Sequence, residues 1–113
     1  MKTIKIRLTA NQMSEWYHAI DIDSDDGHER WWVDSHHPHG KGGTVEILDT
    51  PYAIGRAVYR FTSARDIAND NVGYGYPGDH QHARSMQNMV DKLLAAVGGI
   101  ERVPEDVRRW ITY

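Results

Sequence analysis

The chain has 113 residues, of which 40% are hydrophobic, and this is enough for one domain (residues 1–113) with a single core. A formal net charge of −3 at pH 7 argues against broad electrostatic attraction to nucleic acid or anionic membranes. The absence of cysteine excludes disulfides and thiolate metal sites. With no apolar run typical of a signal peptide or membrane span, this composition predicts a cytoplasmic protein that does not enter a membrane.

The first predicted element is a strand over residues 3–8, because apolar and charged residues alternate there. One side of this strand carries Ile4, Ile6 and Leu8, and the other carries Lys5 and Arg7. Thr9 and Gln12 have the spacing of a capping box, in which each side chain binds the other residue's backbone N–H. We therefore expect a helix that begins after Thr9 and ends near Asp21.

Residues 30–48 predict a β-hairpin with a long loop. The second strand covers residues 30–34, a His-, Gly- and Pro-rich turn follows, and the third strand covers residues 44–48. Successive side chains of a strand point to opposite faces, so neighbouring tryptophans cannot both enter the core. We expect Trp31 and Val33 to face the helices and Trp32 to stand on the outer, charged face.

A long helix should follow at once. Thr50 can cap its first turn and Pro51 suits the first helical position. Its predicted apolar stripe is Ile54, Ala57, Val58, Phe61, Ala64 and Ala68. Asn69 to Asn71 should end this helix, and the Gly- and Pro-rich residues 71–78 should be irregular.

Two further helices complete the chain. The first should begin at Asp79 and stop at Gly98–Gly99, and a short one should begin at Pro104. The order β-α-β-β-α-α-α predicts an α+β domain with a three-stranded, mainly antiparallel sheet and helices packed on one face. The expected core contains Ile4, Ile6, Trp16, Ile47, Val58, Phe61, Val90 and Leu93.

Three aromatic residues are the candidate contacts for a protein partner. Trp32 would be a large indole on a polar sheet face, and tryptophan is common at binding hot spots. Tyr74 and Tyr76 lie in a glycine-rich loop suited to contacts. The alternatives are that the C-terminal helix covers Trp32 and that both tyrosines fold back on the core. The favoured interpretation is a small non-enzymatic protein that binds a protein partner or forms a homodimer.

Basic residues suggest a nucleic-acid- or nucleotide-binding module as an alternative. Lys5 and Arg7 share one side of the first strand, and Arg56 and Arg60 lie one turn apart on the long helix. Each set is small and interleaved with acidic residues, so a solvated surface explains them better than a nucleic-acid site.

Histidines suggest a second alternative, a metal-binding protein or a metal-dependent hydrolase. The candidate ligands are His36, His37, His39, His80 and His82. They lack the rigid spacing of a helical metal motif, and the acidic loop at residues 21–29 departs from a calcium-binding loop at the glycine and the last glutamate. We therefore expect no bound metal, no cofactor and no catalytic residues.

As a whole, the chain resembles the small accessory proteins encoded by bacteriophages. The resemblance is one of type: a compact domain without cysteine, a Thr-capped strand-helix opening, and many Arg, Asp and Trp residues. No residue role follows from it. It implies a protein that acts by binding a host or phage component.

Overall fold

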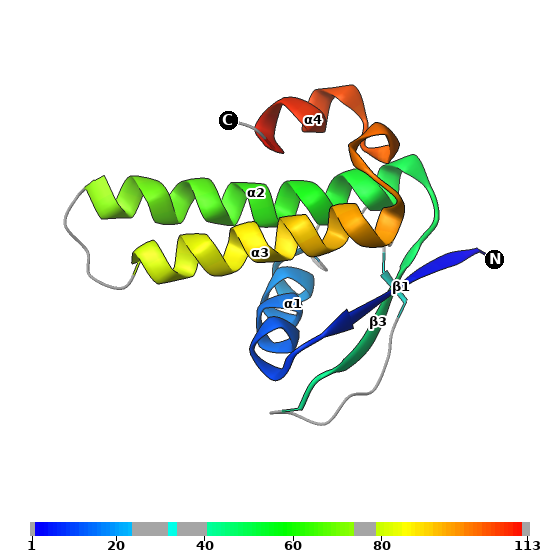
Figure 1. The fold of residues 1–113 in the computed structure, drawn as a ribbon, viewed down its shortest axis with the longest axis horizontal. Coiled ribbons are helices and arrows are strands. Elements are labelled where there is room, and N and C mark those ends of the chain that lie inside the picture. The colour runs from blue at the N-terminus through cyan, green and yellow to red at the C-terminus, as the bar shows by residue number, and fades with distance from the viewer. Residues whose placement is uncertain (1, 24–31, 34–40, 74–78, 112–113) are drawn as a thin grey trace.

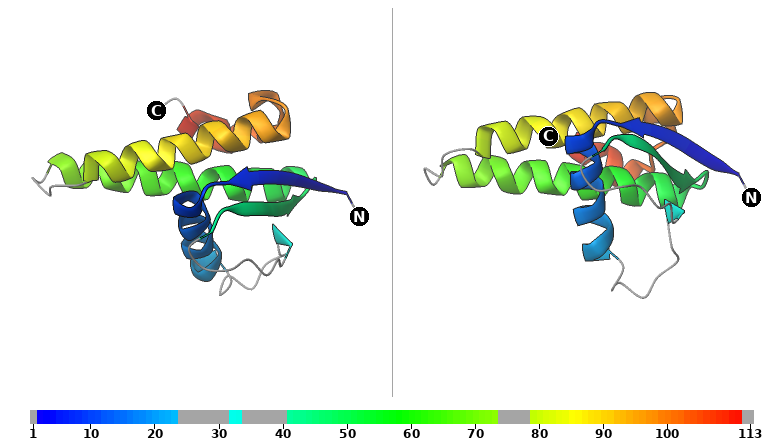
Figure 2. Two further views of the ribbon diagram at one scale, coloured as in Figure 1. Left: turned by 60° about the horizontal axis from the view of Figure 1, so that its bottom comes forward. Right: turned by 90° about the horizontal axis from the view of Figure 1, so that it is seen from below.

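The computed structural model describes residues 2–23, 32–33, 41–73 and 79–111 (Figure 1). Its elements in chain order are β1 (Thr3–Leu8), α1 (Ala10–Asp23), β2 (Trp32–Val33), β3 (Gly43–Leu48), α2 (Pro51–Gly73), α3 (Asp79–Val97), the 3₁₀ turn η2 (Ile100–Arg102) and α4 (Glu105–Ile111). The long helices α2 and α3 lie side by side over one face of β1 and β3 (Figure 2). The short helix α4 packs on α2 (Figure 1).

The sheet differs from the prediction. β1 and β3 form a regular antiparallel ribbon from the pair Thr3–Leu48 to the pair Leu8–Gly43. On the other side of β3, β2 contributes two residues only. The prediction of a regular three-stranded sheet is therefore wrong, because only β1 and β3 form a regular ladder. The predicted order of elements also lacks the turn η2. Two adjacent tryptophans show no alternation, so the pattern that specifies a strand's length and register was missing there.

The prediction for Trp32 was also wrong. Trp32 lies directly opposite Ile47, and both side chains are buried, with 7% of Trp32 exposed. Residues opposite each other in an antiparallel pair point to the same face of the sheet. Because Ile47 belongs to the inward set of β3, Trp32 enters the core rather than the charged outer face. Trp31 lies outside the described residues.

The core lies between the ribbon and the helices, as the periodicity of the sequence predicted. Seven of the eight expected core residues are buried, and Ile4 is half-buried and packs against the others. Trp16 of α1 stacks with Phe61 of α2, with ring centroids 6.2 Å apart and an angle of 21° between the rings. This contact connects α1 to the long helices.

The helix ends confirm the capping predictions. The Thr9 N–H donates to Gln12 Oε1 over 3.0 Å, and the Gln12 N–H donates to Thr9 Oγ1 over 3.3 Å, which is a complete capping box. The Ala53 N–H donates to Thr50 Oγ1 over 3.1 Å. Gly98 and Gly99 have φ values of 101° and 121°, a region that favours glycine, and they end α3. α1 and α2 each run slightly longer than predicted, to Asp23 and Gly73.

Thr50→Ala is expected to lower the free energy of unfolding by about 1 kcal/mol, because the Ala53 N–H loses its hydrogen-bond acceptor. Urea denaturation at fixed protein concentration measures this change. The matched control is Asn69→Ala, an exposed position late in the same helix, where alanine should be neutral or slightly stabilising. An equal loss in both variants would contradict the role of the Thr50 hydroxyl.

None of the helices in the described part of the chain is long and apolar enough to cross a membrane.

Candidate protein-binding groove

The close approach of α4 to α2 depends on a glycine. A Cβ atom built on Gly55 would lie 3.1 Å from Cγ and 3.3 Å from Cδ of Pro104, which is tighter than ordinary van der Waals contact. Glycine therefore lets the start of α4 sit directly on the backbone of α2. Pro104 was predicted to open this helix, and it lies directly before the first residue of α4, where its carbonyl accepts hydrogen bonds from the N–H groups of Val107 and Arg108.

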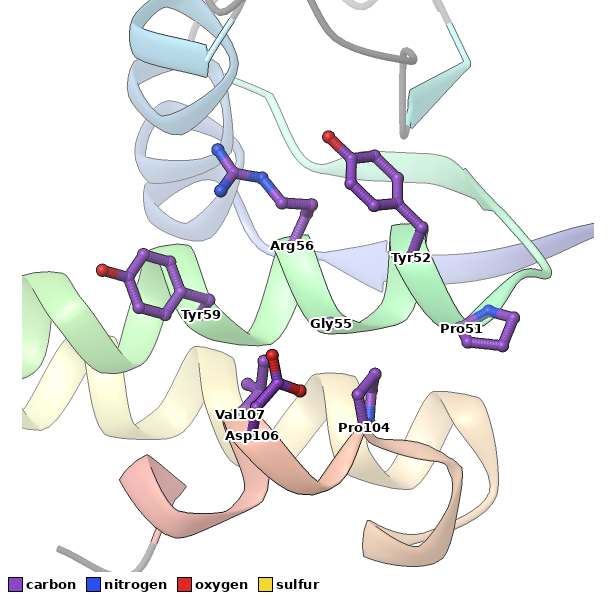
Figure 3. A pocket seen from close by; sticks show the side chains of 8 residues that line it. All are labelled: Pro51, Tyr52, Gly55, Arg56, Tyr59, Pro104, Asp106 and Val107. Atoms are coloured by element: carbon purple, nitrogen blue, oxygen red, sulfur yellow. The ribbon is translucent and has the colours of Figure 1, made fainter.

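A groove runs beside this contact, between α2 and α4 (Figure 3). It has a volume of about 310 Å³, and its walls are α2 from Pro51 to Tyr59 and the segment from Pro104 to Val107. Pro104 and Val107 face α2, whereas Tyr52 and Arg56 extend from α2 on the side away from α4 (Figure 3). A second hollow of about 150 Å³ shares Tyr59 and continues along α2 past Trp110.

Exposed apolar side chains concentrate on α2. Within the described ranges, the large hydrophobic residues with substantial exposure are Tyr52 (37%), Tyr59 (39%) and Ile67 (59%). At 3.6 residues per turn, intervals of seven and eight residues place all three on one side of the helix. The outer face of α2, as we define it, contains the residues within about 60° of Ser63 around the helix axis. These are Tyr52, Arg56, Tyr59, Arg60, Ser63, Asp66, Ile67 and Asp70.

Charge divides this outer face into two halves. Arg56 and Arg60 precede Ser63, and Asp66 and Asp70 follow it. The Arg56 guanidinium lies 6.0 Å from the centroid of the Tyr59 ring, a distance at which a cation is attracted to an aromatic face. The first half of the outer face is therefore basic and the second half acidic, with apolar side chains in both.

Arg65 fastens α4 to the long helices. Arg65 is 6% exposed, and its guanidinium donates to the carbonyls of Trp110 and Ile111 and to Gln87 Oε1. The last carbonyls of a helix lack partners within the helix, and a cation at that end also suits the helix dipole. Arg65 was not among the residues predicted to be important from the sequence. The available signal was its position on the apolar stripe, four residues after Phe61 and three before Ala68.

The predicted site residues do not form one site. Trp32 is buried in the core, so its proposed role as a surface anchor loses its physical basis. Tyr74 and Tyr76 lie outside the described residues, as do the three histidines of the turn, His36, His37 and His39. His80 and His82 are exposed in the first turn of α3. In the ranges that the structure describes, no three His, Asp or Glu side chains are grouped as metal ligands.

The basic residues of the nucleic-acid alternative lie on two separate elements. Lys5 and Arg7 are exposed on the outer side of β1. Glu46 lies directly opposite Lys5 and accepts a hydrogen bond of 2.7 Å from Thr3 Oγ1, so acidic and basic groups are mixed on that surface. Arg56 and Arg60 are half-buried on α2 and share its outer face with Asp66 and Asp70. Nucleic-acid binding stays a prediction.

No protein-family model, curated protein or solved structure matches this chain.

Proposed function

We propose that this protein is a small non-enzymatic interaction protein that binds an amphipathic helix along the outer face of α2. The observation that carries the proposal is the concentration of exposed Tyr52, Tyr59 and Ile67 on one helix face, beside the groove bordered by α4. Aromatic residues with a polar end are enriched where proteins bind one another. The proposed partner-binding surface is therefore the outer face of α2 and does not include the buried Trp32.

The spacing of the exposed residues supports a helix as the bound element. Recognition of a helix in a groove uses apolar contacts repeated every three or four residues and every seven residues. Tyr52 and Tyr59 are seven residues apart and Ile67 follows after eight, so a helix running along α2 would meet an apolar side chain at each second turn. From Tyr52 to Asp70 the face extends about 27 Å at 1.5 Å per residue, the length of a five-turn helix.

The charged residues of the outer face support one defined orientation of the bound helix. The bound helix should carry acidic residues opposite Arg56 and Arg60 and basic residues opposite Asp66 and Asp70, because complementary charges fix register and reject wrong partners. The lack of cysteine supports action in the cytoplasm. The resemblance to bacteriophage accessory proteins supports a phage or host protein as the source of the helix.

A photo-crosslinking amino acid tests this function. p-Benzoylphenylalanine is placed at Tyr59, and in a control protein at Ala95, an exposed position on α3. In the cells that normally produce the protein, we expect irradiation to give a discrete adduct from position 59 and none from position 95. Peptide mapping should place the cross-link in a segment with apolar residues at helical spacing. Equal adducts from both positions, no adduct, or a cross-link to a segment without that spacing would contradict the proposal.

A further inference from the structure

We infer that the helix bound by the outer face of α2 is α2 of a second copy of this chain, lying antiparallel in a two-fold symmetric dimer. The inference rests on the proposed function, since it names the occupant of the same face. It comes from the arrangement of charged residues around Ser63, which makes the outer face complementary to itself. In a symmetric dimer, each contact between two different residues occurs twice.

The charged residues pair when the two-fold axis passes beside Ser63. Arg56 lies seven positions before Ser63 and Asp70 lies seven positions after it. Both residues lie within about 20° of Ser63 around the helix axis, near the midline of the outer face. An antiparallel partner therefore places Asp70 of the second copy opposite Arg56. The symmetry doubles this contact to two oppositely charged pairs.

The same antiparallel register also brings apolar residues of the two copies together. Tyr59 lies four positions before Ser63 and Ile67 lies four positions after it, so each tyrosine meets the isoleucine of the second copy. These two are among the most exposed large apolar side chains in the described part of the chain. Ser63 itself lies at the crossing point, where a small side chain lets two helices approach. One axis thus accounts for charged, apolar and small positions together.

A parallel arrangement of the two α2 helices is disfavoured by the same residues. In register, it would place Arg56 against Arg56 and Asp70 against Asp70 of the second copy, and like charges at close range repel. The antiparallel register converts both repulsions into attractions. The sequence of the outer face therefore selects one orientation of the pair.

The charged groups can make these contacts while keeping the contacts they have within their own chain. Arg56 has interactions within its own chain, and a guanidinium carries five N–H donors, so it can bind a second group. Asp70 is exposed, so solvent and a second chain can reach its carboxylate.

The first test of the dimer is its molar mass, measured by light scattering during size-exclusion chromatography. The purified protein should have twice the 12.9 kDa mass of one chain, and Ile67→Asp should reduce it to the mass of one chain. Ile67 is 59% exposed, so this change should leave the monomer folded by circular dichroism. The matched control Ala95→Asp, on the exposed side of α3, should remain dimeric. A wild-type monomer, or a dimer unaffected by Ile67→Asp, would overturn the inference.

Charge exchange tests the register itself. Arg56→Glu alone places the new carboxylate opposite Asp70 of the second copy, and Asp70→Arg alone places the new guanidinium opposite Arg56 of the second copy. In a two-fold symmetric dimer each of these repulsive contacts occurs twice, so each variant alone should be monomeric. Mixed together, the two variants should form a heterodimer, because the new carboxylate then faces the new guanidinium and Arg56 of one chain faces Asp70 of the other. Loss of a contact within one chain cannot explain recovery on mixing. If each variant alone forms a dimer, or if the mixture stays monomeric, the register is wrong.

A single cysteine tests the position of the axis. The natural chain has no cysteine, so Ser63→Cys introduces the only thiol. Cα atoms in a disulfide are about 4.4–6.8 Å apart, so only a residue at the axis can bond to its own copy without movement of the backbone. Under mild oxidation, Ser63→Cys should become covalently dimeric, whereas the control Ala95→Cys should stay monomeric at the same concentration. Equal rates of dimer formation would refute the axis at Ser63.

These results also separate this inference from the proposed function. A monomeric protein whose Tyr59 position cross-links to a helix of another protein would overturn the second-copy inference and keep the function. A monomer that gives no adduct from position 59 would overturn both, whereas a dimer built through another surface would overturn the second-copy inference alone.

Discussion

Replacing Phe61 by alanine is expected to lower the free energy of unfolding by about 3–5 kcal/mol, the usual cost of removing a fully buried aromatic ring. Phe61 is 1% exposed at the centre of α2 and stacks on Trp16 of α1. Its loss would remove buried apolar area and leave a cavity where α1 meets the long helices. Most small domains have a stability of about 5–15 kcal/mol, so this variant should be close to unfolding at ambient temperature.

Chemical denaturation measures this loss, and all variants are compared at one protein concentration because self-association adds a concentration-dependent amount to the apparent stability. Phe61→Leu is the graded control: it keeps most of the buried volume and should cost clearly less than alanine. The intrinsic fluorescence, summed over the four tryptophans, should change in the alanine variant because Trp16 loses its stacking partner. An alanine variant as stable as the leucine variant would contradict the packing of this ring.

Replacing Arg65 by methionine is expected to lower the free energy of unfolding by about 2–4 kcal/mol, because each carbonyl left without a donor in a buried place costs about 1–3 kcal/mol. Methionine has a similar length and no donors, so it fills part of the space without binding Trp110 or Ile111. The loss should be concentrated in α4. Backbone amides of Glu105–Ile111 should exchange with deuterium faster, whereas those in the middle of α2 should change less.

Two controls distinguish the bonding of Arg65 from its charge. Arg65→Lys keeps the cation but replaces a planar fork by a single ammonium, which cannot serve the two carbonyls and Gln87 in the same geometry, so its stability should lie between those of the natural protein and Arg65→Met. Arg84→Met removes an exposed arginine of α3 and should have little effect. Unchanged exchange in α4 of Arg65→Met would refute the role of Arg65 in fastening that helix.

The groove depends on this fastening, since α4 is one of its walls. In Arg65→Met, detachment of α4 should weaken contacts that use the wall from Pro104 to Val107, whereas the outer face of α2 would remain. The dimer register relies on α2 alone. Comparing the molar mass of Arg65→Met with that of Ile67→Asp therefore shows whether α4 contributes to association.

The helices were predictable from the sequence alone, because their signals are local. The Thr9–Gln12 box, the Thr50 cap and the Gly98–Gly99 stop involve residues within one turn of each other, and all three are formed. The apolar stripe of α2 is equally local, since helical spacing alone places Phe61 in the core. The outer face of α2 was also present in this pattern, as the side opposite the stripe, but its importance depends on what the rest of the chain leaves uncovered.

The face of Trp32 and the role of Arg65 could not be predicted in this way, because each depends on a long-range contact. Trp32 faces inward because it lies opposite Ile47, a residue fifteen positions later, and two adjacent tryptophans carry no alternation that could predict this register. Arg65 is buried because carbonyls more than forty residues later need donors. Both depend on contacts between segments that are far apart in the sequence. The spacing of apolar residues within one segment does not show which distant segment it will contact.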